Sequence, residues 1–213
     1  FVNLSGDFGF IKNGTRIEAG VTNVDALLEN TNYSVGVSGG VLALILENDG
    51  TYAFEASGFV SLTGNNLSNP ASADASVTKN TTSVDYEAAP LTIVVGDFET
   101  TLSVGSNVES VSIEGLSVDV TNFVNLSGNF GFRKTGGVIE ATADSVDAQL
   151  INGSYSVGVT EGTLAMLLND DGTRAFEASG AFNLSGGDFV NATATTVFVR
   201  ENTTATDYSL SPL

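Results

Sequence analysis

Two acidic turns carry the side chains of this sequence that come closest to a chemical site. Asn48-Asp49-Gly50 lies between two alternating apolar stretches, and Asn169-Asp170-Asp171-Gly172 lies between two more further along the chain. Oxygen ligands gathered on a loop are what Ca²⁺ binds in proteins. Neither turn matches an EF-hand or a Gly-Gly-x-Gly-x-Asp run, and Asp-Gly between alternating apolar residues is first of all a hairpin signal. Asp49, Asp170 and Asp171 are therefore the candidate calcium ligands, and calcium is the one cofactor that the sequence leaves open.

The residue types needed for most catalytic sites are absent from this chain. It contains no Cys, His or Trp, which excludes Cys-His and Ser-His nucleophiles and thiolate or imidazole metal sites. Glu55 and Glu177 both lie in the sequence Ala-Phe-Glu-Ala-Ser-Gly, and a glycosidase would need two carboxylates flanking a cleft. However, strand alternation places each of them on the face opposite its Phe and Ala neighbours, which we expect to be the solvent face. We therefore predict no enzyme and no catalytic residues.

The charge of the chain is strongly negative in every part. The formal net charge is −18, divided as −7 in residues 1–91, −5 in 92–122 and −6 in 123–213. Nucleic acids and anionic membranes are bound through clusters of Lys and Arg, so neither is an expected partner. No apolar run approaches the roughly 18 residues of a membrane-spanning helix, so we predict no transmembrane segment.

A long internal repeat organises the chain. The sequence of its first ten residues, Phe1–Phe10, recurs almost unchanged at Phe123–Phe132. The offset of about 122 residues holds to the last residue. A fixed period is the signature of a repeat architecture. The sequence therefore divides into a first copy (residues 1–91), connecting strands that complete the repeat (92–122) and a second copy (123–213). The interruption of the pattern at both ends suggests a piece of a longer tandem array.

The elements that carry these turns are predicted to be long strands. Apolar residues alternate along most of the chain, and hairpin turns such as Asn13-Gly14 join antiparallel neighbours. A change of phase at Gly39-Gly40 predicts a bulge. No turn is evident from Val108 to Lys134, which predicts a strand that bends at Gly115 and passes into a second sheet. The predicted fold is all-β, with long antiparallel strands in two packed sheets and copies joined as an elongated rod; the alternative is a β-solenoid.

The predicted core consists of phenylalanines on the apolar faces of these strands. Tyrosines at strand ends are expected at sheet edges, since an amphipathic ring suits such a position. The phenylalanines are Phe8, Phe10, Phe54, Phe130, Phe132 and Phe176.

Three motifs give the chain a family resemblance. They are Asp/Asn-Phe-Gly-Phe, Tyr-Ser-Val-Gly-Val and Asp-Gly-Thr-x-Ala-Phe-Glu-Ala-Ser-Gly, and the chain resembles the tandem repeats of giant secreted or cell-surface bacterial proteins, labelled adhesin-like or haemolysin-type. The resemblance covers the whole chain and implies export and a place outside the cell or on its surface. It implies a structural function as a spacer, filament or matrix-building element, with neighbouring repeats or identical chains as partners. The alternative is an adhesin module that recognises polysaccharide or another surface and is stiffened by calcium.

Overall fold

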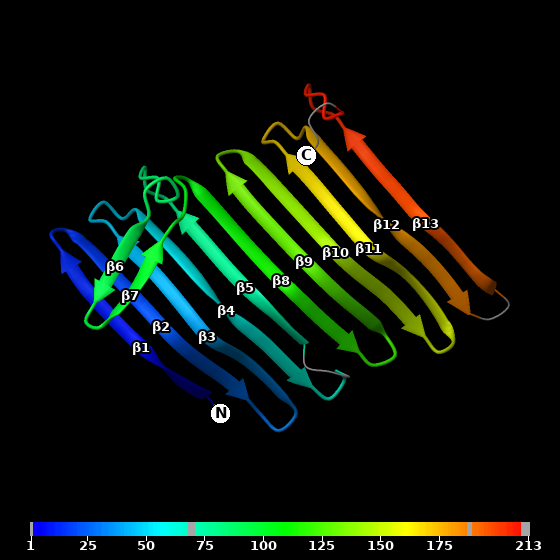
Figure 1. Cartoon of the computed structure of the whole chain (residues 1–213), viewed down its shortest axis with the longest axis horizontal. Coiled ribbons are helices and arrows are strands. Elements are labelled where there is room, and N and C mark those ends of the chain that lie inside the picture. The colour runs from blue at the N-terminus through cyan, green and yellow to red at the C-terminus, as the bar shows by residue number, and fades with distance from the viewer. Residues whose placement is uncertain (1, 68–70, 187–188, 210–213) are drawn as a thin grey trace. The chain divides into compact units, whose positions relative to one another are not determined.

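The chain folds into strands joined by short turns. The computed structural model describes residues 2–67, 71–186 and 189–209, and no helix occurs among them (Figure 1). The strands are β1 (Val2–Asn13), β2 (Arg16–Glu29), β3 (Tyr33–Leu46), β4 (Tyr52–Gly64), β5 (Ala71–Asn80), β6 (Leu91–Val95), β7 (Phe98–Leu102), β8 (Val108–Val120), β9 (Val124–Thr135), β10 (Val138–Asn152), β11 (Tyr155–Leu168), β12 (Arg174–Gly186) and β13 (Phe189–Asn202).

Eleven of these strands form one sheet. Its order is β1-β2-β3-β4-β5-β8-β9-β10-β11-β12-β13, and β6 and β7 pair separately. Each register that the structure describes is antiparallel, as short hairpin turns require. The all-β, antiparallel prediction is confirmed. The prediction of two packed sheets of long strands is wrong, because the long strands share one sheet and the second sheet is a short hairpin. The described strands pair antiparallel and do not form the alternative, a parallel solenoid.

Two compact units divide the chain. The first comprises Phe1–Gly64 and Ala73–Ser112, and the second comprises Asn65–Ser72 and Ile113–Leu213.

Bulges explain the changes of phase in the sequence. The register shifts on β2 at Asn23 and on β3 at Gly39, and both residues have a positive φ, 54° and 60°. Each bulge inserts one residue, so the side-chain alternation changes phase while the apolar side chains stay on the same side of the sheet. The bulge predicted at Gly39-Gly40 is confirmed.

One side of the first unit's sheet is apolar as a result. Register and alternation place on it the apolar residues of β1 to β4, and we call this side the apolar face. Its larger members are Val2, Leu4, Phe8, Phe10, Ile17, Val21, Val24, Leu28, Val35, Val37, Leu42, Leu44, Leu46, Tyr52, Phe54, Val60 and Leu62.

The stretch from Val108 to Lys134 contains a turn that the sequence does not reveal. β8 ends at Val120, and the Phe123 amide donates a hydrogen bond to the Val120 carbonyl at 3.0 Å. Between them Asn122 adopts φ 58°, a conformation that Asn tolerates better than most residues. Gly115 does mark an irregular point in β8, with φ 62°. The strand that was expected to pass into a second sheet instead turns back and is followed by β9 in the same sheet.

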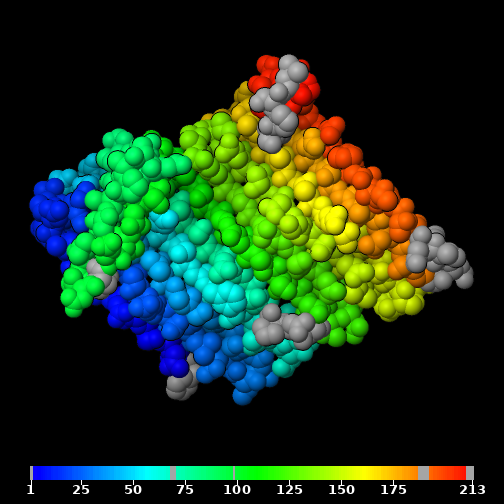
Figure 2. Space-filling view, viewed as in Figure 1, coloured from blue at the N-terminus to red at the C-terminus, as the bar shows by residue number. Residues whose placement is uncertain are grey.

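The buried core of the first unit lies under the β6–β7 hairpin, on the side opposite the apolar face. The hairpin packs against β2 and β3 and appears in green over the blue strands in Figures 1 and 2. Ile93 and Leu102 from the hairpin and Ile45 from β3 are fully buried. The remaining members of the cluster are Ala43, Ala53, Tyr86, Val104 and Val108.

The prediction of a phenylalanine core is wrong, because the β6–β7 hairpin covers the side of the sheet opposite the phenylalanines. Phe8, Phe10 and Phe132 expose 51%, 71% and 50% of their surface, and the other three phenylalanines are only partly buried. Alternation identifies the apolar side of a strand, but it does not say which side another layer covers. Here the hairpin covers the side that carries Glu18 and Glu55.

Candidate functional site

The acidic turns use their carboxylates to hold their own backbone. Asp49 accepts hydrogen bonds from the Thr51 amide at 2.9 Å and the Thr51 hydroxyl at 2.7 Å. Asp171 accepts the same pair from Thr173, at 2.8 and 2.6 Å. These bonds favour the ionised carboxylate and lower the pKa of both groups, through Thr51 in one turn and Thr173 in the other.

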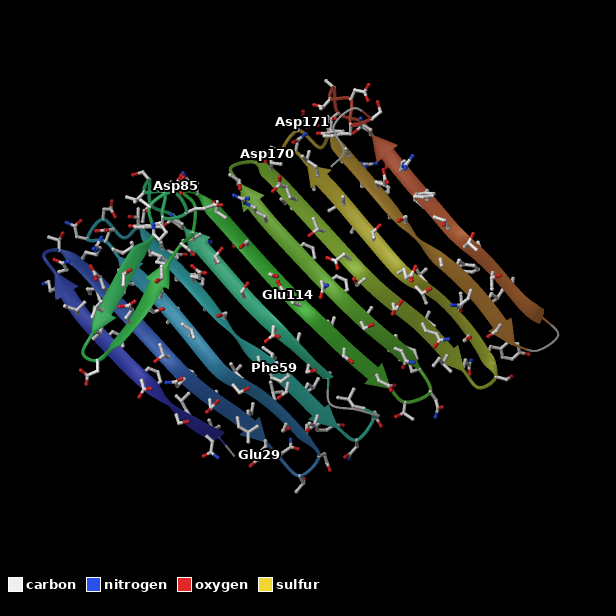
Figure 3. All side chains as sticks on the ribbon, in the orientation of Figure 1. Glu29, Phe59, Asp85, Glu114, Asp170 and Asp171 are labelled. Atoms are coloured by element: carbon white, nitrogen blue, oxygen red, sulfur yellow. The ribbon has the colours of Figure 1, made fainter. Side chains whose placement is uncertain are left out.

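The third candidate calcium ligand, Asp170, projects differently. Its carboxylate lies over Gly137 at the β9–β10 turn, next to Asp171 in the sequence (Figure 3). Within the residues that the structure describes, no group of three or more Asp, Glu, His or Cys side chains could hold a metal ion. Calcium binding at Asp49, Asp170 and Asp171 stays a prediction, and hydrogen bonding within the turn is the role that the geometry gives Asp49 and Asp171.

We expect Thr51→Val to raise the pKa of Asp49, because the substitution removes the hydroxyl donor and leaves the amide donor. The carboxyl groups are fully exposed, so the bond shifts the pKa without a large effect on folding. A folded-state pKa below the unfolded value gives stability that is present above the unfolded pKa, near 3.9, and is lost as pH falls through the folded pKa. Carbon-detected NMR titration of the Asp side chains measures the shift.

Thr51→Ser provides the control for this titration, since it keeps the hydroxyl and should keep the low pKa. An unchanged Asp49 titration in Thr51→Val would contradict the assignment of the shift to this bond.

Each of the repeated glutamates has a hydrogen-bonding partner within its own unit. Glu55 was expected to face solvent, but its Oε2 accepts hydrogen bonds from the Ser103 amide at 3.0 Å and the Ser103 hydroxyl at 2.9 Å. Glu177 instead pairs with Arg200, with 2.9 Å between Glu177 Oε2 and Arg200 Nε. Glu55 thus lies on the face opposite its Phe and Ala neighbours, as predicted, and is partly exposed there. The sequence did not predict that this side chain holds the end of the β6–β7 hairpin. Ser103 gave no signal in the sequence because it lies in the connecting segment, which occurs once.

An asparagine joins β8 to the bulges of the next two strands. Asn129 on β9 accepts a hydrogen bond from the Gly115 amide at 2.8 Å and donates one to Asp144 at 2.8 Å. Asp7 occupies the corresponding place on β1 and accepts a hydrogen bond from Asn23 at 2.9 Å. β1 lies at the end of the strand order, so no described strand lies beside it in the place that β8 and its Gly115 occupy beside β9. The edge of β1 therefore presents backbone groups and a carboxylate to a further strand.

The apolar face of the first unit carries exposed apolar side chains on each of its four strands. Large apolar side chains from β1 to β4 expose between 39% and 71% of their surface on this side: Val2, Leu4, Phe8, Phe10, Ile17, Leu28, Val35, Leu46 and Leu62. Its one charged member is Lys12, paired in register with Ile17. Contiguous apolar patches beyond a few hundred Å² are uncommon on isolated domains and mark interaction surfaces.

Fold and surface define the class of this molecule: an all-β protein built on an eleven-stranded antiparallel sheet, with acidic turns, a first strand that pairs on one side only and an exposed apolar face. No protein-family model, curated protein or solved structure matches the chain. Among the described residues there is no helix with the length and apolarity to cross a membrane.

Proposed function

We propose that this chain is a structural segment of a giant extracellular or cell-surface protein, acting as a spacer, filament or matrix-building element. The observation that carries the proposal is that backbone geometry recurs with the sequence period. Asn23 and Ser145, 122 positions apart, have φ values of 54° and 53°; Gly39 and Glu161 have 60° and 52°.

The positive φ at Glu161 is the most informative of these, because glutamate keeps there the left-handed conformation that glycine adopts at the equivalent Gly39. A left-handed conformation costs an L-residue roughly 1–2 kcal/mol. Asp147 accepts a hydrogen bond from the Glu161 amide at 3.0 Å, just as Asp25 accepts one from the Gly39 amide at 3.2 Å. The bulge is therefore retained although the residue type changes. This supports a single repeated architecture and argues against two similar structures that arose independently.

The unpaired edge supports neighbouring repeats or identical chains as partners. β9 has β8 beside it, whereas the corresponding strand β1 has a neighbour on one side. Tandem copies gain stability chiefly from contacts with adjacent copies. A repeat array supplies the missing neighbour without a new kind of contact.

The test is small-angle X-ray scattering on this chain and on a version with four copies of the repeat. The proposal requires the maximum dimension to grow in proportion to copy number, and a compact particle of constant proportions would contradict it. Measurements with and without Ca²⁺ separate two forms of the proposal. If Ca²⁺ leaves the dimensions unchanged, the segment is a constitutive spacer; if it lengthens the particle, the acidic turns stiffen it.

A second function, an adhesin module that binds a polysaccharide or another surface, is favoured by the apolar face alone. Aromatic side chains such as Phe8 and Phe10 are exposed on this face of the sheet, and an exposed apolar patch is typical of an interaction surface. Retention on immobilised polysaccharide that Phe10→Ser abolishes, with unfolding unchanged, would support this function over the spacer.

A further inference from the structure

The β6–β7 hairpin of the first unit is held by a defined set of contacts. The hairpin packs chiefly against β2 and β3, and its apolar residues Ile93 and Leu102 are fully buried in a cluster with Ala43, Ile45 and Ala53. The segment that follows is fixed by polar bonds: Ser103 donates twice to Glu55, and the Val104 carbonyl accepts from the Asn80 side chain at 3.3 Å and the Tyr86 amide at 3.1 Å. We call the surface that receives the hairpin the hairpin seat: Ala43, Ile45, Ala53, Glu55, Asn80 and Tyr86.

The second unit contains the same seat 122 residues later. Its members are Ala165, Leu167, Ala175, Glu177, Asn202 and Tyr208. The loop that carries the last two is built alike in both units. Asn80 donates to Val84 at 2.8 Å and accepts from the Thr82 amide at 2.8 Å; Asn202 donates to Thr206 at 2.8 Å and accepts from the Thr204 amide at 2.9 Å.

In the second unit, no described residue occupies this seat. Asn80 is 2% exposed and Tyr86 4%, whereas Asn202 is exposed and Tyr208 is partly exposed. A hollow of about 680 Å³ lies there, lined among others by Ala165, Ala175, Glu177, Asn202 and Tyr208. The apolar floor and the acceptor carboxylate are present without the hairpin that covers them in the first unit.

The two seats differ in two respects, a wall residue and the neighbour of the outer strand. Arg200, which stands where the first unit has Thr78, lies in the wall of the hollow and pairs with Glu177. The outer strand of the seat also differs. β5 has β8 beside it, with 2.7 Å between the Thr78 and Ser110 hydroxyls, whereas β13 ends the strand order. The segment that fills the first seat therefore supplies both a hairpin and a strand for the neighbouring edge.

We propose that the hollow over β11, β12 and β13 is a docking site for a further copy of the connecting segment, residues 92–122. Its hairpin covers β10 and β11, as β6–β7 covers β2 and β3, and the segment after the hairpin fills the hollow. Its serine equivalent to Ser103 donates to Glu177, and its strand equivalent to β8 pairs with β13. The inference rests on the proposed function, and it names the segment through which one copy holds the next.

The experiment extends the full chain after Leu213 by the sequence of residues 92–122. Hydrogen-exchange mass spectrometry then follows the segments 163–177 and 198–209. The expected result is protection of both segments by about tenfold or more, since the seat passes from open to covered. A matched extension, with serine at the positions equivalent to Ile93 and Leu102, should give none of this protection.

Two substitutions in the extended chain test the contacts. Glu177→Ala removes the acceptor and should reduce the added protection, whereas Arg200→Thr recreates the first unit's wall and should retain or increase it. The inference is overturned if the native extension and its serine version protect equally, or if neither protects.

The outcome is separable from that of the proposed function. Scattering dimensions that grow with copy number, together with an unprotected hollow, would leave the spacer standing and remove this docking site. Protection by the extension in a chain whose multi-copy version is compact would do the reverse.

Discussion

Ile45→Ala is expected to lower the free energy of unfolding of the first unit by about 3 kcal/mol, and Leu167→Ala that of the second by only about 1 kcal/mol. The two residues occupy the same position in the repeat, yet Ile45 is fully buried beneath the β6–β7 hairpin and Leu167 is only partly buried. Truncation at Ile45 leaves a cavity between two layers, whereas truncation at Leu167 removes a side chain that is already partly in contact with solvent. Urea unfolding followed by circular dichroism and residue-resolved NMR measures both losses.

Leu46→Ala is the control, because Leu46 lies beside Ile45 on the other side of the strand and exposes 41% of its surface. It should cost much less than Ile45→Ala. Equal losses for Ile45→Ala and Leu167→Ala would mean that the hairpin does not stabilise the seat it covers.

Asn80→Ala should have a similarly large effect, about 3 kcal/mol, against about 1 kcal/mol for Asn202→Ala. Asn80 is buried and fully hydrogen bonded, to Val84 and Val104 as donor and to Thr82 as acceptor. Alanine leaves the buried Thr82 amide without its acceptor and removes a donor from the Val84 and Val104 carbonyls, of which Val104 keeps the Tyr86 amide. Asn202 makes the same local bonds in an exposed loop, where water replaces them. Denaturant unfolding of the two variants gives the comparison.

Asn80→Asp separates the two halves of the interaction, since it keeps the acceptor for Thr82 and loses the donor to both carbonyls. If the aspartate is protonated, we expect a loss of unfolding free energy between those of Asn202→Ala and Asn80→Ala. If the buried carboxylate stays ionised, the loss should exceed that of Asn80→Ala. A loss for Asn80→Ala as small as that for Asn202→Ala would show that solvent enters the loop.

The sequence predicted most of the strand pattern because its signals are local. Alternation, Asn-Gly and Asp-Gly turns and the break at Gly39-Gly40 each depend on a few neighbouring residues. The structure has strands and turns at these places. The sequence did not predict the turn at Asn122, because Thr121 and Asn122 separate two alternating stretches without a glycine to mark the turn.

What the sequence could not give was the arrangement of layers. The apolar side of β1 is evident from Val2, Leu4, Phe8 and Phe10, and burial was the natural expectation for it. Which side is covered depends instead on where the connecting segment folds back, and that segment has no second copy for comparison. The role of Glu55 was missed with it, because its partner Ser103 lies 48 residues away in the chain.

The order of the strands also bears on how the chain acquires its structure. From β1 to β5, and again from β8 to β13, each strand pairs with the strand that precedes it. Such neighbours close short loops, so their pairing costs little chain entropy and is fast. The pairing that departs from this order joins β5 to β8, across the residues that form the β6–β7 hairpin. The chain can thus fold strand by strand in sequence order, and the β5–β8 pairing is the step that must wait for the residues between these strands to be in place.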